Sequence, residues 1–94
     1  MTEKDKKHFN IRIFGQVQDV NFRYYATAVA KKLNLTGFVR NDSNGSVYVE
    51  AEGAEETLQQ LLNWCKKGPA WAKVEKVEIT EGPLKKFSDF KISY

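Results

Sequence analysis

The sequence predicts a single α+β domain in which two helices lie on one face of an antiparallel sheet. Segments with an apolar residue at every second position alternate with two segments whose apolar residues follow helical spacing. An Asn-Gly pair marks a hairpin between two of the predicted strands. With 94 residues, 41% of them apolar, the chain can build one core but not two domains.

The first predicted strand covers residues 9–14, in which every second residue is apolar. Residues 1–8 are charged, so we expect them to form a flexible tail that includes the only histidine, His8. The folded domain is accordingly expected over residues 9–94.

The first helix is predicted to begin at Phe22, where the apolar spacing changes from two residues to three and four. Asn21 is expected at the N-cap, and Asn34 is expected in the left-handed conformation that ends many helices. The apolar stripe consists of Phe22, Tyr25, Ala26, Val29 and Leu33.

A β-hairpin is predicted after this helix. Residues 37–40 are β-like, Asn44-Gly45 is the turn, and residues 46–52 form the second strand. The side chains expected to point away from the core are Tyr48, Glu50 and Glu52.

The clearest helix is predicted over residues 53–68. Glutamates in its first turn and lysines in its last turn complement the helix dipole, and Gly68-Pro69 ends it. Its apolar stripe consists of Leu58, Leu61, Leu62 and Cys65. Residues 74–79 and 90–94 are predicted as two further strands.

This order of elements, β-α-β-β-α-β with an added terminal strand, is that of a ferredoxin-like α/β sandwich. The fold hosts many unrelated functions, so it does not by itself indicate an activity.

Composition excludes several function classes. One cysteine rules out an internal disulfide framework, and one histidine argues against a zinc-type cluster, so we expect neither a metal nor a cofactor. The net charge of +3 comes from interspersed charges, which is not a nucleic-acid footprint. The chain has no apolar run of the roughly 18 residues that span a membrane and no secretory signal, so a cytoplasmic location is expected.

Two residues are candidates for chemistry. Arg23 falls in the first turn of the first helix, where the dipole disfavours a cation unless an anion binds there. The alternative is an arginine that lies along the surface. Asn41 follows the first hairpin strand, where it is either a turn residue or an amide that holds a water molecule.

The segment GQVQDVNFR, residues 15–23, resembles the acylphosphatase signature G-x-V-Q-G-V-x-F-R, with a mismatch at Asp19. Residues 37–47, GFVRN followed by NGSV, resemble the second block of that family. Gly68-Pro69 and the closing F-x-I-x-Y pattern are also similar to it. The resemblance covers nearly the whole chain, from about residue 9 to residue 94.

The resemblance implies an enzyme that hydrolyses acyl phosphates to a carboxylate and inorganic phosphate. It implies that Arg23 and the backbone N–H groups of the first loop hold the phosphate, while Asn41 orients the attacking water. The residues of that phosphate loop are Gly15, Gln16, Val17, Gln18, Asp19, Val20 and Asn21. Partners are then the acyl phosphate and inorganic phosphate, which is product and competitor, and the default oligomeric state is a monomer.

Other interpretations remain open on the sequence. Asp19 replaces a family glycine with a carboxylate, which would oppose phosphate if it pointed inward, so the domain could be catalytically impaired and bind only an anion or a partner protein. An RNA-binding module has the same element order, but the expected open face offers only Phe14 and Tyr48 as stacking aromatics. Cys65 is expected in the core rather than as a nucleophile.

Overall fold

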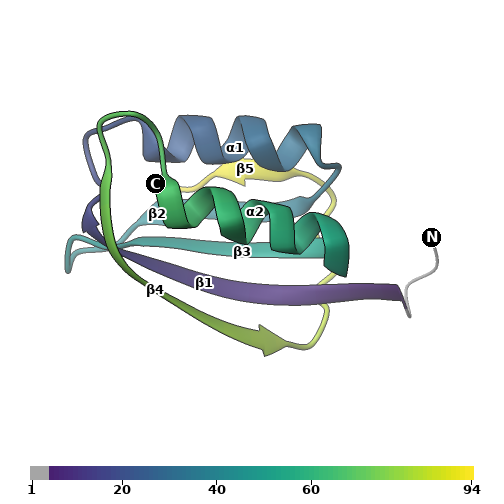
Figure 1. Ribbon diagram of the computed structural model, residues 1–94. Coiled ribbons are helices and arrows are strands. Elements are labelled where there is room, and N and C mark those ends of the chain that lie inside the picture. Colours follow the sequence, from purple (N-terminus) through teal and green to yellow (C-terminus); the bar gives the residue numbers. More distant parts are fainter. Residues whose placement is uncertain (1–4) are drawn as a thin grey trace.

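The computed structural model describes residues 5–94 and has the predicted element order. Its elements are β1 (Lys6–Gln16), α1 (Phe22–Lys32), β2 (Thr36–Asn41), β3 (Val47–Ala54), α2 (Glu55–Lys67), β4 (Lys73–Gly82) and β5 (Phe90–Ile92). The five strands form one sheet in the order β4-β1-β3-β2-β5, and both helices cover the same face (Figure 1). The ferredoxin-like arrangement is therefore confirmed.

The sheet differs from the prediction at one edge. The pairs among β1 to β4 are antiparallel, as expected, whereas β5 lies parallel to β2. The chain returns through the segment after β4 and enters β5 in the same direction as β2, with Val39 opposite Ile92. No helix within residues 5–94 is long and apolar enough to cross a membrane.

The prediction of a flexible tail over residues 1–8 is wrong for residues 6–8, which belong to β1. Strand β1 begins at Lys6, because β3 pairs with it from that residue onward and β4 pairs with it from His8. His8 is 1% exposed. Residues 1–4 lie outside the described residues.

The core lies between the helices and the sheet. The predicted stripe of α2 is fully confirmed, because all four of its residues are buried. In α1 the buried residues are Phe22, Ala26 and Ala30, whereas Tyr25 is 46% exposed. The stripe of α1 therefore follows a spacing of four residues, and the small alanines let the helix pack closely on the sheet.

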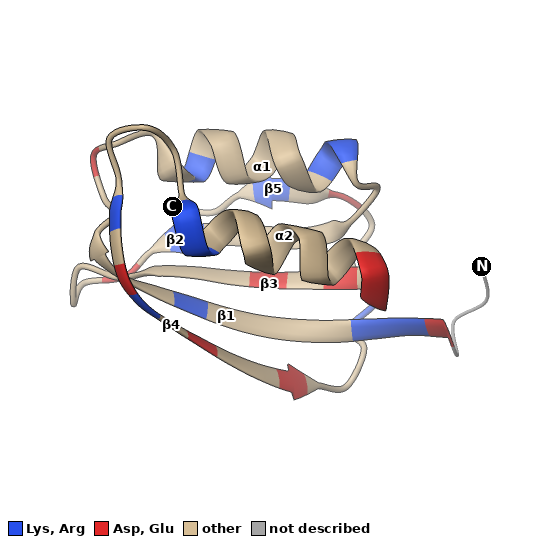
Figure 2. Ribbon diagram, viewed as in Figure 1, with Lys and Arg blue, Asp and Glu red and all other residues tan. Residues whose placement is uncertain are grey.

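Helix α2 begins at Glu55, two residues after the predicted start, because Gly53 and Ala54 still belong to β3. The charge pattern persists: acidic residues lie in the first turn of α2 and basic residues in its last (Figure 2). Gly68 ends the helix with φ 70°, and its N–H donates to the carbonyl of Trp64.

The other face of the sheet is partly covered, which the alternation of β3 did not indicate. Glu50 and Glu52 point away from the helices as predicted, but they are only 6% and 4% exposed. The segment between β4 and β5 covers them, and the backbone N–H groups of Lys85 and Lys86 donate to the Glu52 carboxylate. The Nδ1 atom of His8 lies 2.7 Å from the same carboxylate.

Candidate active site

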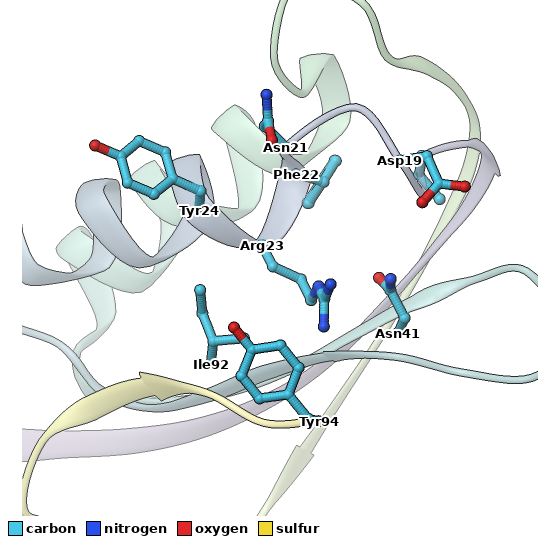
Figure 3. A pocket seen from close by; sticks show the side chains of 9 residues that line it. Asp19, Asn21, Phe22, Arg23, Tyr24, Asn41, Ile92 and Tyr94 are labelled. Atoms are coloured by element: carbon cyan, nitrogen blue, oxygen red, sulfur yellow. The ribbon is translucent and has the colours of Figure 1, made fainter.

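A pocket of about 400 Å³ opens at one end of the sheet. The β1–α1 loop, the first turn of α1, the end of β2 and the C-terminal segment form its walls (Figure 3). It is lined by Val17, Asp19, Asn21, Phe22, Arg23, Tyr24, Asn41, Ile92 and Tyr94. The pocket thus brings together both residues predicted to carry chemistry.

Arg23 is the second residue of α1, as predicted, and no acidic residue lies in that first turn. Its guanidinium lies over the ring of Tyr94, with Cζ 4.9 Å from the ring centre. Within residues 5–94, no carboxylate forms an ion pair with Arg23. The positive charge and the N-terminus of the helix therefore face the same pocket without an internal counter-ion.

Asn41 is the last residue of β2, so it reaches the pocket from the sheet rather than from the helix. In Figure 3 its amide points toward the guanidinium of Arg23. An amide has both a donor and an acceptor, and this position allows it to hold a polar molecule beside an anion bound at Arg23.

The loop that joins β1 to α1 presents free backbone donors. In the described part of the chain, the N–H groups of residues 17–21 donate to no backbone or side-chain acceptor. Asp19 and Asn21 have φ of 61° and 64°, the left-handed conformation, which aspartate and asparagine adopt more readily than most other non-glycine residues. Asn21 precedes the helix as predicted, but its side chain makes no capping hydrogen bond.

Only part of the predicted phosphate loop reaches the pocket. Val17, Asp19 and Asn21 line it, whereas Gly15, Gln16, Gln18 and Val20 do not. Gly15 and Gln16 belong to β1 and pair with β4. A Cβ atom on Gly15 would lie 2.1 Å from the carbonyl oxygen of Lys73, so this glycine is needed for close approach to β4 and not to a ligand.

Gln18 has a role that the sequence analysis missed. Its Nε2 donates to the carbonyl oxygens of Asp42 and Ser46, at 2.7 Å and 2.9 Å. These carbonyls belong to the hairpin turn that follows Asn41. Gln18 therefore ties the phosphate-loop segment to the turn beside Asn41, and only the resemblance to the family motif singled out this residue beforehand.

The carboxylate of Asp42, the residue that follows Asn41, is paired with two arginines. Asp42 forms ion pairs with Arg12 and Arg40, and the hydrogen bond from Arg40 is the main reason why the pKa of Asp42 lies below its usual value. Its charge is therefore compensated on the hairpin.

Asp19, the residue that departs from the family motif, is exposed and lies at the edge of the pocket. It makes no ion pair with Arg23, and Figure 3 shows its carboxylate away from both Arg23 and Asn41. Asp19 is the only Asp or Glu among the lining residues, and no histidine is among them, within the described chain.

Cys65 is not part of this site. The thiol is completely buried on α2, and burial raises its pKa to about 12. A buried neutral thiol is a poor nucleophile, which agrees with its predicted place in the core.

The sheet face away from the helices gives no support to RNA binding. Phe38 and Phe87, which the sequence analysis did not count, lie there with Tyr48, and the Phe38 ring contacts both of the other rings. The guanidinium groups of Arg12 and Arg40 both lie 4.6 Å from the centre of the Tyr48 ring. The Tyr48 ring, one of the two aromatics expected to stack, is therefore not free to do so.

Comparisons with known proteins agree with the geometry. The acylphosphatase family model matches residues 9–92. The acylphosphatase of Ligilactobacillus salivarius is 42% identical over 90 residues, which cover 94% of this chain and 99% of that protein. The structure of an acylphosphatase from Coxiella burnetii superposes with a TM-score of 0.93 at 34% identity, covering 99% of this chain and all of that one. The acylphosphatase structure from Bacillus subtilis has a TM-score of 0.91 at 36% identity, covering 94% of this chain and 99% of that one.

Proposed function

Because this chain belongs to the acylphosphatase family of enzymes, we propose that it hydrolyses the carboxyl–phosphate bond of acyl phosphates with Arg23 and Asn41 as its catalytic residues. Arg23 and the free backbone N–H groups of the loop residues that line the pocket, Val17, Asp19 and Asn21, hold the phosphate, and Asn41 positions the attacking water. The observation that carries the proposal is the pocket in which an unpaired arginine, a helix N-terminus and an amide meet.

The chemistry needs few groups. The leaving group of an acyl phosphate is a carboxylate, so no strong general acid is required. Transfer of the phosphoryl group depends mostly on positioning and on stabilisation of charge. The guanidinium binds two phosphate oxygens side by side, while the loop N–H groups bind the others.

No general base is assigned. Asn41 does not titrate, and the pocket is lined by no histidine within the described residues. The one lining carboxylate, that of Asp19, lies away from Asn41 in Figure 3. A phosphate oxygen of the substrate is therefore the proposed acceptor of the water proton. A pH–rate profile that requires one enzyme group near neutrality, traced to a single side chain by mutation, would contradict this step.

The test is hydrolysis of benzoyl phosphate, with inorganic phosphate as competitor. The unmodified protein should release phosphate and be inhibited by it. Arg23→Lys keeps the charge but loses the planar fork, so we expect a loss of roughly 100-fold or more in kcat/KM. Full or half activity in Arg23→Gln would show that the anchor is elsewhere.

The alternative is an impaired domain that binds an anion without hydrolysing it. It rests on Asp19, a carboxylate at the edge of an anion pocket. Hydrolysis that is absent in the unmodified protein and restored by Asp19→Gly would favour it.

We further propose that the protein is a cytoplasmic monomer that needs neither a metal nor a cofactor. Sedimentation equilibrium tests the oligomeric state.

A further inference from the structure

The active-site pocket has a polar half and an apolar half, and the Arg23 side chain extends between them (Figure 3). Asn41 and Asp19 lie on one side of it. Tyr24 and Ile92 lie on the other side, and Tyr94 lies beneath the guanidinium. The proposed function uses only the polar half, which leaves the aromatic half without a role.

The apolar half is unusually accessible. Tyr24 is 64% exposed and Tyr94 is 97% exposed, although both belong to the wall of a concave site. Aromatic side chains that keep one face open in a pocket offer a large, stiff contact area to a ligand. Ile92 is partly buried against the core, which fixes the floor between the two rings.

The in-line geometry of phosphoryl transfer places the acyl group of the substrate in this half of the pocket. In phosphoryl transfer the attacking and leaving oxygens lie roughly in line, on opposite sides of phosphorus. If the water is held at Asn41, the acyl oxygen leaves on the far side of the phosphate. That side faces Tyr24, Ile92 and Tyr94.

We infer that Tyr24, Ile92 and Tyr94 form the acyl-binding wall, and that the preferred substrates carry a neutral aromatic or branched apolar acyl group. This inference rests on the proposed function, since it takes the phosphate to be bound at Arg23.

The charges around the pocket explain why the preferred acyl group is neutral. Arg23 is the only cation that lines the pocket in the described chain, and the phosphate occupies it, while Asp19 adds a negative charge. An acyl group with its own carboxylate is therefore disfavoured.

A neighbouring groove supplies the matched control. It holds about 430 Å³ on the other side of α1 and is lined by Tyr25, Trp64 and Trp71 among others, but not by Tyr24. Tyr24 and Tyr25 are adjacent in the sequence and both exposed, and each lines only one of the two pockets. Tyr25→Ala thus removes the same side chain from the same helix and leaves all three residues of the proposed wall in place. It also removes an edge-to-face contact with Tyr24, because the centres of the two rings lie 5.2 Å apart.

The experiment compares kcat/KM for benzoyl phosphate and acetyl phosphate in the unmodified protein, Tyr24→Ala and Tyr25→Ala. Tyr24→Ala should lower the benzoyl-to-acetyl ratio roughly fivefold to tenfold, the range expected for lost contact with one ring, and leave the phosphate inhibition constant unchanged. Tyr25→Ala should change the ratio much less than Tyr24→Ala does, because it leaves Tyr24, Ile92 and Tyr94 in place. An unchanged ratio in Tyr24→Ala, or a fall in Tyr25→Ala instead, would overturn the inference and place the acyl group in the neighbouring groove or in solvent.

A binding measurement separates this inference from the proposed function. Calorimetry with benzylphosphonate and methylphosphonate needs no hydrolysis. Preference for the benzyl compound that is lost in Tyr24→Ala supports the wall even if the protein hydrolyses no acyl phosphate, in which case only the proposed function fails. Equal affinity for the two phosphonates in a protein that does hydrolyse acyl phosphates overturns the wall alone.

Discussion

Gln18 holds the two halves of the active site in register, and its removal is the sharpest test of the site geometry. The two hydrogen bonds from Nε2 join the β1–α1 loop to the turn after Asn41. Each neutral hydrogen bond of this kind contributes about 0.5–1.5 kcal/mol. Both carbonyls keep another donor, since the N–H of Gly45 bonds to Asp42 and the N–H of Asp42 bonds to Ser46. Gln18→Ala therefore orphans no acceptor, and we expect a loss of about 1–2 kcal/mol in the free energy of unfolding.

For a domain of this size, that loss lowers Tm by about 5–15 °C. We expect Gln18→Ala to affect the catalytic rate more than the stability, because the loop N–H groups and Asn41 are no longer fixed relative to each other. Displacement by about 1 Å can cost on the order of 100-fold in rate. We expect kcat to fall and the phosphate inhibition constant to rise together in Gln18→Ala.

The control is Gln16→Ala, two residues earlier. Gln16 is exposed at the end of β1, and its side chain makes no hydrogen bond within residues 5–94. Gln18→Glu keeps the size but turns the donor into a carboxylate facing two carbonyls, so it should be worse than Gln18→Ala. Thermal unfolding and phosphate inhibition of the three variants decide the matter. If Gln18→Ala matches Gln16→Ala in both measurements, the tie between loop and hairpin is not what positions the site.

Three further predictions follow from the site and the sheet. Asn41→Ala should lower kcat on the order of 100-fold with little change in the phosphate inhibition constant, because the role proposed for the amide is to hold water and not the anion. The reverse pattern would place Asn41 among the groups that bind phosphate. Asp19→Gly should tighten phosphate binding roughly fivefold at low salt and less at high salt. If the unmodified protein and Asp19→Gly have the same phosphate inhibition constant at each salt concentration, the charge of Asp19 does not affect phosphate binding. The pKa of Glu52 is lowered because its hydrogen bonds from the Lys85 backbone and from His8 outweigh the effect of burial. The resulting stability is present above the ordinary glutamate pKa of 4.5 and is lost as pH falls through the lowered value, so urea unfolding should show a smaller loss between about pH 7 and about pH 3 in Glu52→Gln than in the unmodified protein.

The errors of prediction concern residues whose environment comes from distant parts of the chain. His8 looked like part of a charged tail, but β3 and β4 pair with β1 beyond the apolar segment and bury it. Glu50 and Glu52 alternate with apolar residues as solvent-facing residues do, yet the segment after β4 covers them. Tyr25 fits the helical stripe by spacing, but the stripe of α1 that meets the sheet runs through its alanines.

By itself the sequence determined the α+β class, the order of elements, the left-handed residue after α1, Asn34, and the two residues proposed for catalysis. These depend on periodicity, turn chemistry and a motif, all of which are local. Only the tertiary structure decided that Arg23 and Asn41 share one pocket, that Gln18 bridges to the hairpin, and that Tyr24, Ile92 and Tyr94 face the far side of the arginine. The physical reason is that these relations join α1, β2 and the C-terminal segment, and their distances are set by how the helices pack on the sheet and by the order of strands in it.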